Sequence, residues 1–390
     1  MIQYDSISYT DCLYIRIMFI IMKKNYFLYI GILLLFNSCL SNTGDEKIRV
    51  VNQQIQEPTD TIKGRVVPID SIIMPFRLSC INDYLIITNQ TEPLFSVMNS
   101  EDSVISQFGT IGHANNEFNS PPNSVYCKEN ADGELLMYVP TETQTKIINL
   151  TKSIKQNKTI IEEIRKDGMQ NVGDHVYIDA PNRKFTYKPI SFKGDMRDHD
   201  FLPANLTDIK GKETEILYSN PLTIIGERDL VMTINVTSFN AKPDLSKFVE
   251  LGLFMDYISI INVPDKSSKI IRFNDNDIEK LEKICTHGSY DQVVNDLVVR
   301  NIFSCVSDDY IFVLYDGVHS PVAMDNIIYE PGMFTPTIRI LDWEGNYLSS
   351  FILREPITVI AYNETANTLY GLDAENTLYK YDISKYLKKK

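Results

Sequence analysis

The densest group of side chains able to do chemistry lies at 195–200, where the sequence is DMRDHD. Its three carboxylates and the imidazole of His199 are groups that bind divalent cations, since Ca²⁺ takes oxygen ligands and imidazole suits transition metals. Runs of charged residues are more often solvated loops. We therefore take Asp198 and His199 as candidate ligand-binding residues. No metal ligand or cofactor is assigned, although calcium or another divalent metal stays open.

The sequence contains no familiar catalytic motif. Its five histidines, at 113, 175, 199, 287 and 319, form no H-E-x-x-H pair, and neither a G-x-S-x-G motif nor a P-loop occurs. No catalytic residue is assigned. The pattern favours a protein without catalytic activity over an enzyme, and it leaves the question open.

Segment 274–279, NDNDIE, begins like a calcium-binding EF-hand loop. Such a loop needs glycine at its sixth position and glutamate at its twelfth, and this chain has neither. Asp277 is better suited to cap a helix, because apolar residues follow at helical spacing from Ile278 to Ile284. We expect a short helical insertion near residues 275–300.

Two further residues are candidates for ligand binding. Trp343, the only tryptophan, lies in a predicted hairpin turn, where an exposed ring would stack on a sugar or another partner. Packing of the ring onto a neighbouring blade is the favoured alternative, since aromatic side chains tend to be buried. His319 precedes a long loop, Ser320–Pro336, and long loops on a rigid scaffold often bind ligands. We expect a ligand face that combines this loop with 108–118 and 195–200.

Charge and cysteine spacing exclude several classes of protein. The chain has 38 basic and 51 acidic residues, a net charge of −13, and no basic stripe, so no nucleic-acid partner is expected. Outside the leader, Cys80, Cys127, Cys285 and Cys305 are too far apart for a zinc ribbon or a thioredoxin-type site. We interpret them as small buried hydrophobic residues, and a Cys285–Cys305 disulfide stays open.

The amino-terminal segment has the features of a secretory signal. Lys23 and Lys24 precede an apolar run, Tyr26–Phe36, which is shorter than the roughly 20 residues that span a bilayer. A membrane helix over Met18–Leu35 is the alternative. It would place both lysines in the bilayer interior, where each charge costs about 3 kcal/mol.

The sequence FNSC, which ends at Cys39, resembles a bacterial lipobox. The resemblance implies cleavage before Cys39 and a diacylglycerol on its sulfur. We expect residues 1–38 to be a signal peptide, of which 1–21 are a mis-called extension if Met22 is the true start. Residues 39–64 are then expected to be a polar tether to the lipid.

Strands must hold these candidate residues in place. In Thr335–Leu353, apolar residues alternate on both sides of the turn DWEGN, where Gly345 tolerates a positive φ. Weaker copies of this unit recur around six anchor residues: Tyr84, Leu135, Val176, Leu230, Tyr310 and Leu369. Their intervals of 51, 41, 54, 80 and 59 residues fit blades of about 40 to 50 residues once the helical insertion is allowed for.

We therefore expect an all-β fold, a six-bladed β-propeller over residues 65–390. An early strand, Arg65–Ile73, is expected to pair with the carboxy-terminal strands and close the ring. Closure protects strand edges that would otherwise aggregate. A β-sandwich would show strands every 8–12 residues without a longer period, and the repeat counts against it.

Phe108, Gly109, Gly112, Glu117 and Phe118 match a motif of Bacteroidetes six-bladed propeller lipoproteins, which are related to NHL and TolB-like propellers. This chain has ANN where those proteins usually have Gly-Pro-Gly before the Glu-Phe pair. The carboxy-terminal segment is also similar to the end of such propellers. The resemblance implies a lipid-anchored protein of the cell envelope, at the outer membrane on its periplasmic or surface face, and brings no assigned chemistry.

The sequence favours a binding or scaffold module, anchored in the membrane through the lipid on Cys39, for an envelope protein, peptide or glycan. The alternative is a metal-dependent hydrolase or lyase with its site at the mouth of the propeller channel. That alternative requires histidines or carboxylates from several blades to converge at one end of the channel.

Overall fold

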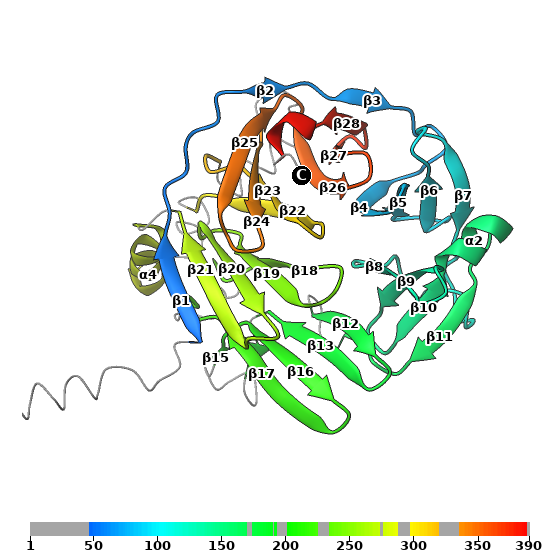
Figure 1. Ribbon diagram of the computed structural model, residues 1–390, viewed down its shortest axis with the longest axis horizontal. Coiled ribbons are helices and arrows are strands. Elements are labelled where there is room, and N and C mark those ends of the chain that lie inside the picture. The colour runs from blue at the N-terminus through cyan, green and yellow to red at the C-terminus, as the bar shows by residue number, and fades with distance from the viewer. Residues whose placement is uncertain are drawn as a thin grey trace, which may run out of the picture. The chain divides into compact units, whose positions relative to one another are not determined.

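The computed structural model describes residues 47–169, 174–189, 191–192, 201–224, 234–273, 276–287, 297–319 and 335–387. The chain divides into two units after Lys47, and every helix and strand described here lies in the second unit, Ile48–Lys390. In this unit six sheets of four or five strands follow one another around a central axis (Figure 1). The fold is the six-bladed β-propeller expected from the sequence.

Each blade is built from strands that are neighbours in the sequence, and the first strand of each is the innermost. Blade 1 comprises β4 (Pro75–Ile81), β5 (Tyr84–Asn89), β6 (Phe95–Met98) and β7 (Val104–Phe108). Blade 2 comprises β8 (Tyr126–Glu129), β9 (Leu135–Pro140), β10 (Thr145–Asn149) and β11 (Ile161–Arg165). Blade 3 comprises β12 (His175–Ala180), β13 (Arg183–Lys188), β16 (Asn205–Lys210) and β17 (Glu213–Ser219). Blade 4 comprises β18 (Thr237–Ala241), β19 (Lys247–Gly252), β20 (Tyr257–Asn262) and β21 (Ser267–Arg272). Blade 5 comprises β22 (Asn301–Val306), β23 (Tyr310–Tyr315), β24 (Thr337–Asp342) and β25 (Tyr347–Leu353). Blade 6 comprises β26 (Ile357–Asn363), β27 (Thr368–Asp373) and β28 (Leu378–Asp382). A small hairpin, β14 (Ser191–Phe192) with β15 (Phe201–Leu202), lies between β13 and β16, and a 3₁₀ turn, η1 (Ser384–Tyr386), follows β28.

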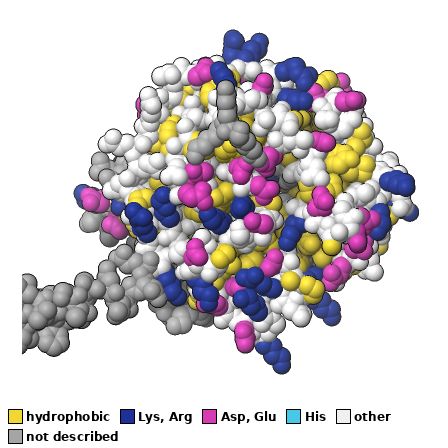
Figure 2. Space-filling model, viewed as in Figure 1, with side chains coloured by type: hydrophobic (Ala, Val, Ile, Leu, Met, Phe, Trp, Pro, Cys, Tyr) yellow, Lys and Arg dark blue, Asp and Glu magenta, His cyan; other side chains and the backbone are white. Residues whose placement is uncertain are grey.

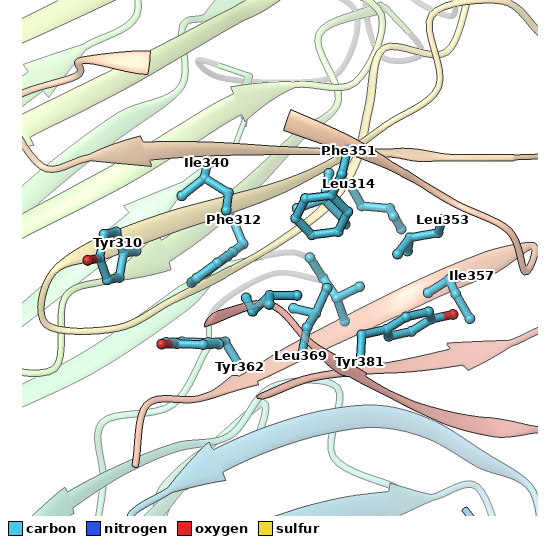
Figure 3. Close-up of a cluster of buried hydrophobic side chains, with 13 residues drawn as sticks. Tyr310, Phe312, Leu314, Ile340, Phe351, Leu353, Ile357, Tyr362, Leu369 and Tyr381 are labelled. Atoms are coloured by element: carbon cyan, nitrogen blue, oxygen red, sulfur yellow. The ribbon is translucent and has the colours of Figure 1, made fainter. Parts of the chain in front are cut away.

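The hydrophobic core lies between the blades. Both faces of a blade pack on neighbours, so middle strands are apolar almost throughout, as in β5, where five of the six residues are buried. Figure 3 shows the cluster between blades 5 and 6, where Phe312 and Phe351 meet Leu369 and Tyr381. Burying one such side chain contributes about 1.5–3 kcal/mol.

The hairpin predicted at Thr335–Leu353 is confirmed as β24 and β25. Gly345 has a φ of +74°, the left-handed region that the turn requires. Asp342 closes the turn, because its Oδ1 accepts hydrogen bonds from the backbone N–H groups of Glu344 (3.1 Å) and Asn346 (2.8 Å). An Asx-type turn therefore sets the register of the pair.

The amino-terminal segment of this unit runs along the outer edges of three consecutive blades (Figure 1). β1 (Ile48–Asn52) adds a parallel fifth strand to blade 4, and β2 (Thr61–Ile62) adds one to blade 5. β3 (Arg65–Val67) pairs with β28 and supplies the fourth strand of blade 6, so the predicted ring closure is confirmed. The stretch expected as a tether, 39–64, thus contains two paired strands, which its polar composition did not predict.

The predicted helix is α4 (Asn276–His287). A second helix, α2 (Leu150–Gln156), was not predicted. It begins after β10, where the Asn149 side chain accepts a hydrogen bond from the N–H of Lys152 (2.9 Å) and caps it. The fourth anchor, Leu230, lies outside the described residues, and the strands of blade 4 begin at Thr237. No helix in the described ranges is long and apolar enough to cross a membrane.

Candidate functional site

The inner strands of all six blades surround a cavity of about 380 Å³ on the propeller axis. Its walls are formed by Arg77–Cys80 of β4, Tyr126 and Cys127 of β8, His175 and Tyr177 of β12, Thr237–Ala241 of β18, Ile302–Val306 of β22 and Ile360–Tyr362 of β26. The volume lies in the range typical of small-molecule sites. We take this central channel as the candidate site.

Arg77 carries a positive charge on the channel wall. Its guanidinium carbon lies 5.6 Å from the ring centroid of Phe76 and 5.5 Å from that of Phe303. One N–H contacts the carbonyl oxygen of Phe76 at 3.4 Å, a long and weak hydrogen bond. Burial lowers the pKa of Arg77, and among the described residues no carboxylate forms an ion pair with it.

His175 reaches the same cavity from the third blade. Its ring stacks with Tyr177, with centroids 6.4 Å apart, and also contacts Tyr187 and Phe239. The Nδ1 atom is buried and has no hydrogen-bond partner among the described residues. Burial, with a smaller contribution from the positive charge of Arg77, lowers the pKa of His175 to about 4. The imidazole is therefore neutral at pH 7, with one ring nitrogen unused.

Three cysteines line the channel near its middle: Cys80, Cys127 and Cys305. All three are free thiols, so Cys305 makes no disulfide with another described cysteine. Burial raises the pKa of Cys127 to about 12 and raises those of Cys80 and Cys305 further. The thiols are protonated at neutral pH, which agrees with the interpretation of these residues as small hydrophobic groups.

The channel widens at the end where the inner strands finish. A second cavity of about 550 Å³ lies there and shares Cys80, Cys127 and Tyr362 with the first. Four acidic residues line this mouth: Glu129, Asp244, Asp308 and Glu364. Lys128 is the one basic residue among its described lining residues, and its Nζ lies 3.8 Å from Asp179 Oδ1. The mouth is therefore acidic, whereas the interior carries two basic residues, Arg77 and Lys242, of which Lys242 pairs with Asp244 at 3.2 Å.

Of the site residues predicted from the sequence, the two that the structure describes, His319 and Trp343, do not line this channel. Asp198 and His199, and loop residues 320–334, lie outside the described part of the chain. His319 follows β23, and its Nδ1 lies 2.8 Å from Asp316 Oδ1, while its backbone N–H donates to Asp316 Oδ2 at 2.8 Å. Asp316 thus fixes the position of His319, which does not line either channel cavity.

Trp343 does not offer a surface for stacking on a ligand. Its side chain is 4% exposed and packs against Val249 and Ile260 of blade 4. Its indole N–H donates to the carbonyl oxygen of Ser307 at 3.0 Å. The ring packs onto a neighbouring blade, which is the alternative that the sequence favoured. The reason is that the hairpin turn lies against an apolar face.

The motif at 108–118 has a structural role in the described fold. Phe118 is fully buried and contacts the Phe95 ring edge-on, with centroids 5.5 Å apart. Gly109 has a φ of +92°, and a side chain at Gly112 would collide with the Glu117 carboxylate. That carboxylate also accepts the N–H of Ala114 at 2.9 Å. The matching residues, Phe108, Gly109, Gly112, Glu117 and Phe118, therefore shape the connection between blades 1 and 2 and do not line the channel.

Sequence patterns carry only a weak signal for the residues that line the channel. Arg77 is a charged residue in an otherwise mainly apolar strand, PFRLSCI, and this contrast is the local signal for it. His175 belongs to no recognisable motif and is one histidine among five. Among the described residues, no group of three or more His, Cys, Asp or Glu side chains could hold a metal ion.

Acidic and basic side chains are interspersed over the face shown in Figure 2. No protein-family model matches the chain, and no curated protein matches it. The fold is similar to several solved structures. A DUF4221-family member from Bacteroides vulgatus is 10% identical, with 79% of this chain and 91% of that chain covered and a TM-score of 0.48. An exported protein from Bacteroides fragilis is 10% identical, covering 83% and 88%, with a TM-score of 0.44.

A third similar structure is regucalcin from Agrobacterium tumefaciens, described as a calcium-binding protein. It is 8% identical, covering 83% of this chain and 95% of that chain, with a TM-score of 0.41. These likenesses do not transfer a function to this chain.

Proposed function

We propose that this protein is a lipid-anchored binding module of the cell envelope that takes its ligand into the central channel. The cavity formed jointly by all six inner strands carries the proposal. Its walls combine aromatic rings, such as Tyr126 and Phe239, with polar groups, such as Thr237 and Ser238. In ligand sites, apolar surface supplies contact area and a few polar groups fix the orientation of the ligand.

The envelope location is supported by the sequence that precedes the propeller. Two lysines, an apolar run and the lipobox-like FNSC sequence together indicate export and lipidation of Cys39. We expect radiolabelled palmitate to be incorporated into the full chain expressed in a Gram-negative host, and the Cys39→Ser variant to lose the label and leave the membrane fraction. Equal labelling of both chains would refute the lipid anchor.

The channel itself can be tested by filling it. Ser238 lines the cavity from β18, so Ser238→Trp places a large ring inside it. Thr214, exposed on β17, provides the matched control Thr214→Trp away from the channel. We would measure thermal melting of each full-length chain, in detergent, against panels of short peptides and oligosaccharides.

The expected result is that one class of probe raises the melting temperature of the wild type and of Thr214→Trp, but not that of Ser238→Trp. Circular dichroism would establish beforehand that both variants are folded. A probe that stabilises Ser238→Trp as strongly as the wild type would refute binding in the channel.

A further inference from the structure

Unlike Arg339 and Arg183, Arg77 has no carboxylate partner among the described residues. Arg339 is buried and forms an ion pair with Asp256, with an N–O distance of 2.7 Å. Arg183 is held by Asp208 at 2.9 Å. A guanidinium withdrawn from water without a counter-charge is costly, because its desolvation is not compensated. The channel therefore presents an unused positive charge to whatever enters it.

The surroundings of Arg77 are suited to a planar anion that has an apolar body. The rings of Phe76 and Phe303 flank the guanidinium, and His175 adds a buried nitrogen without a partner. Arginine binds carboxylates through two parallel N–H groups, a geometry that a lysine cannot reproduce. Lys242 also lines the cavity, but its Nζ lies 3.2 Å from Asp244 Oδ2 in an ion pair. Arg77 is therefore the basic lining residue that has no carboxylate partner among the described residues, and it fits one carboxylate.

The acidic mouth sets a second requirement on the ligand. A simple anion would be repelled by Glu129, Asp244, Asp308 and Glu364 and by the net charge of −13, whereas a ligand with a positive end would be attracted. Arg77 and the mouth residue Ile81 are separated by four steps along the strand β4. At roughly 3.3 Å per residue this is a distance of about 13 Å. The ligand must therefore carry opposite charges about that far apart.

We propose that the channel binds a short peptide by its free carboxyl end, with the carboxylate on Arg77 and a positively charged amino-terminal end at the acidic mouth. An extended peptide of about five residues spans this distance. The inference rests on the proposed function and names its ligand class.

The test uses calorimetric titration of the full chain with pooled pentapeptides that begin with lysine and end with leucine or phenylalanine. A second pool has the same sequences with the carboxyl end amidated. A third pool keeps the free carboxylate but is acetylated at the amino end, with glutamine in place of lysine. We expect amidation to weaken binding at least tenfold, and the third pool to bind more weakly than the first, with the difference shrinking in high salt.

Substitutions in the protein test the same contact between Arg77 and the peptide carboxylate. Arg77→Gln is expected to lose at least tenfold in affinity for the free-carboxylate pool, and Arg77→Lys to lose less. Arg65→Gln makes the same charge change at an exposed residue on β3 and is expected to bind like the wild type. The amidated pool tests the same contact without a mutation, so a variant that fails to fold does not block the test.

The outcomes separate the two proposals. Equal binding of the free and amidated pools, unchanged binding by Arg77→Gln, or no binding of any peptide pool would overturn the carboxylate inference. The proposed function would stand in each case if other probes still lose binding in Ser238→Trp. Peptide binding that survives in Ser238→Trp would overturn both.

Discussion

Glu250 on β19 is a fully buried carboxyl group between blades 3 and 4. Its Oε1 accepts hydrogen bonds from the Tyr257 hydroxyl (2.8 Å) and from the Asn220 amide (2.6 Å). Its Oε2 is buried without a hydrogen-bond partner among the described residues. The Tyr187 hydroxyl lies 2.5 Å from Thr237 Oγ1, and the Tyr218 hydroxyl donates to Ser259 Oγ at 2.9 Å. Burial therefore outweighs these contacts and raises the pKa of Glu250 from 4.5 to about 7.

This pKa shift predicts how stability depends on pH. In the unfolded chain Glu250 loses its proton near its ordinary pKa of 4.5, whereas in the folded protein it keeps the proton until about pH 7. The folded state thus binds more protons between these values, so its free energy of unfolding falls as the pH rises. The difference of about 2.5 between the two pKa values corresponds to about 3 kcal/mol. This loss of folding stability is absent below pH 4.5 and complete above pH 7.

Glu250→Gln removes the titration and keeps the shape of the side chain. The free energy of unfolding of this variant minus that of the wild type is expected to increase by about 3 kcal/mol as the pH is raised from 4 to 8.5. Urea denaturation followed by circular dichroism at several pH values measures this difference. Other groups titrate in both proteins, so they cancel in the comparison.

The control is Glu213→Gln, which makes the same change at an exposed position on β17 and is expected to leave the pH dependence unchanged. The reasoning would be refuted if the stability curves of Glu250→Gln and the wild type ran parallel from pH 4 to pH 8.5. A Glu250→Gln variant that lost stability as the pH rose would also contradict the assigned sign.

Three further predictions concern stability and metal content. Arg339→Ala leaves Asp256 buried without its partner and is expected to lower the free energy of unfolding by about 3–5 kcal/mol in urea titrations. Deleting residues 65–74 removes β3 and leaves blade 6 with an open edge, so calorimetry should show a broad transition instead of a cooperative one. If Asp198 and His199 bind a divalent metal, elemental analysis of the purified chain will find it in stoichiometric amount and EDTA will lower the melting temperature.

Each of these predictions has a contradicting result. A double variant, Arg339→Met with Asp256→Leu, removes both charges and should be more stable than Arg339→Ala; equal losses would argue against an unpaired charge as the cause. Cooperative melting of the deletion variant would contradict closure through β3. A metal-free protein whose melting EDTA does not alter would remove the metal-dependent hydrolase alternative.

Local features of the sequence were sufficient to predict much of the fold. The alternation on both sides of Gly345 located the hairpin of blade 5, because strand period and turn chemistry involve residues close together in the chain. The same holds for α4, whose apolar spacing is local. Strands that pair with partners far away in the chain could not all be predicted from the sequence. β1 is a short segment that becomes a strand only because the edge of β21, more than 200 residues away, accepts it.

The candidate site shows the same division more strongly. From the sequence alone, six repeats that close into a ring could be predicted, because each repeat has apolar faces that only neighbouring repeats can cover. The sequence did not determine which side chains meet on the axis. Arg77 and His175 belong to different blades, and only the closed ring brings both to one cavity. Tertiary structure likewise decided that Trp343 is buried and that Glu250 keeps its proton, since both depend on how adjacent blades pack.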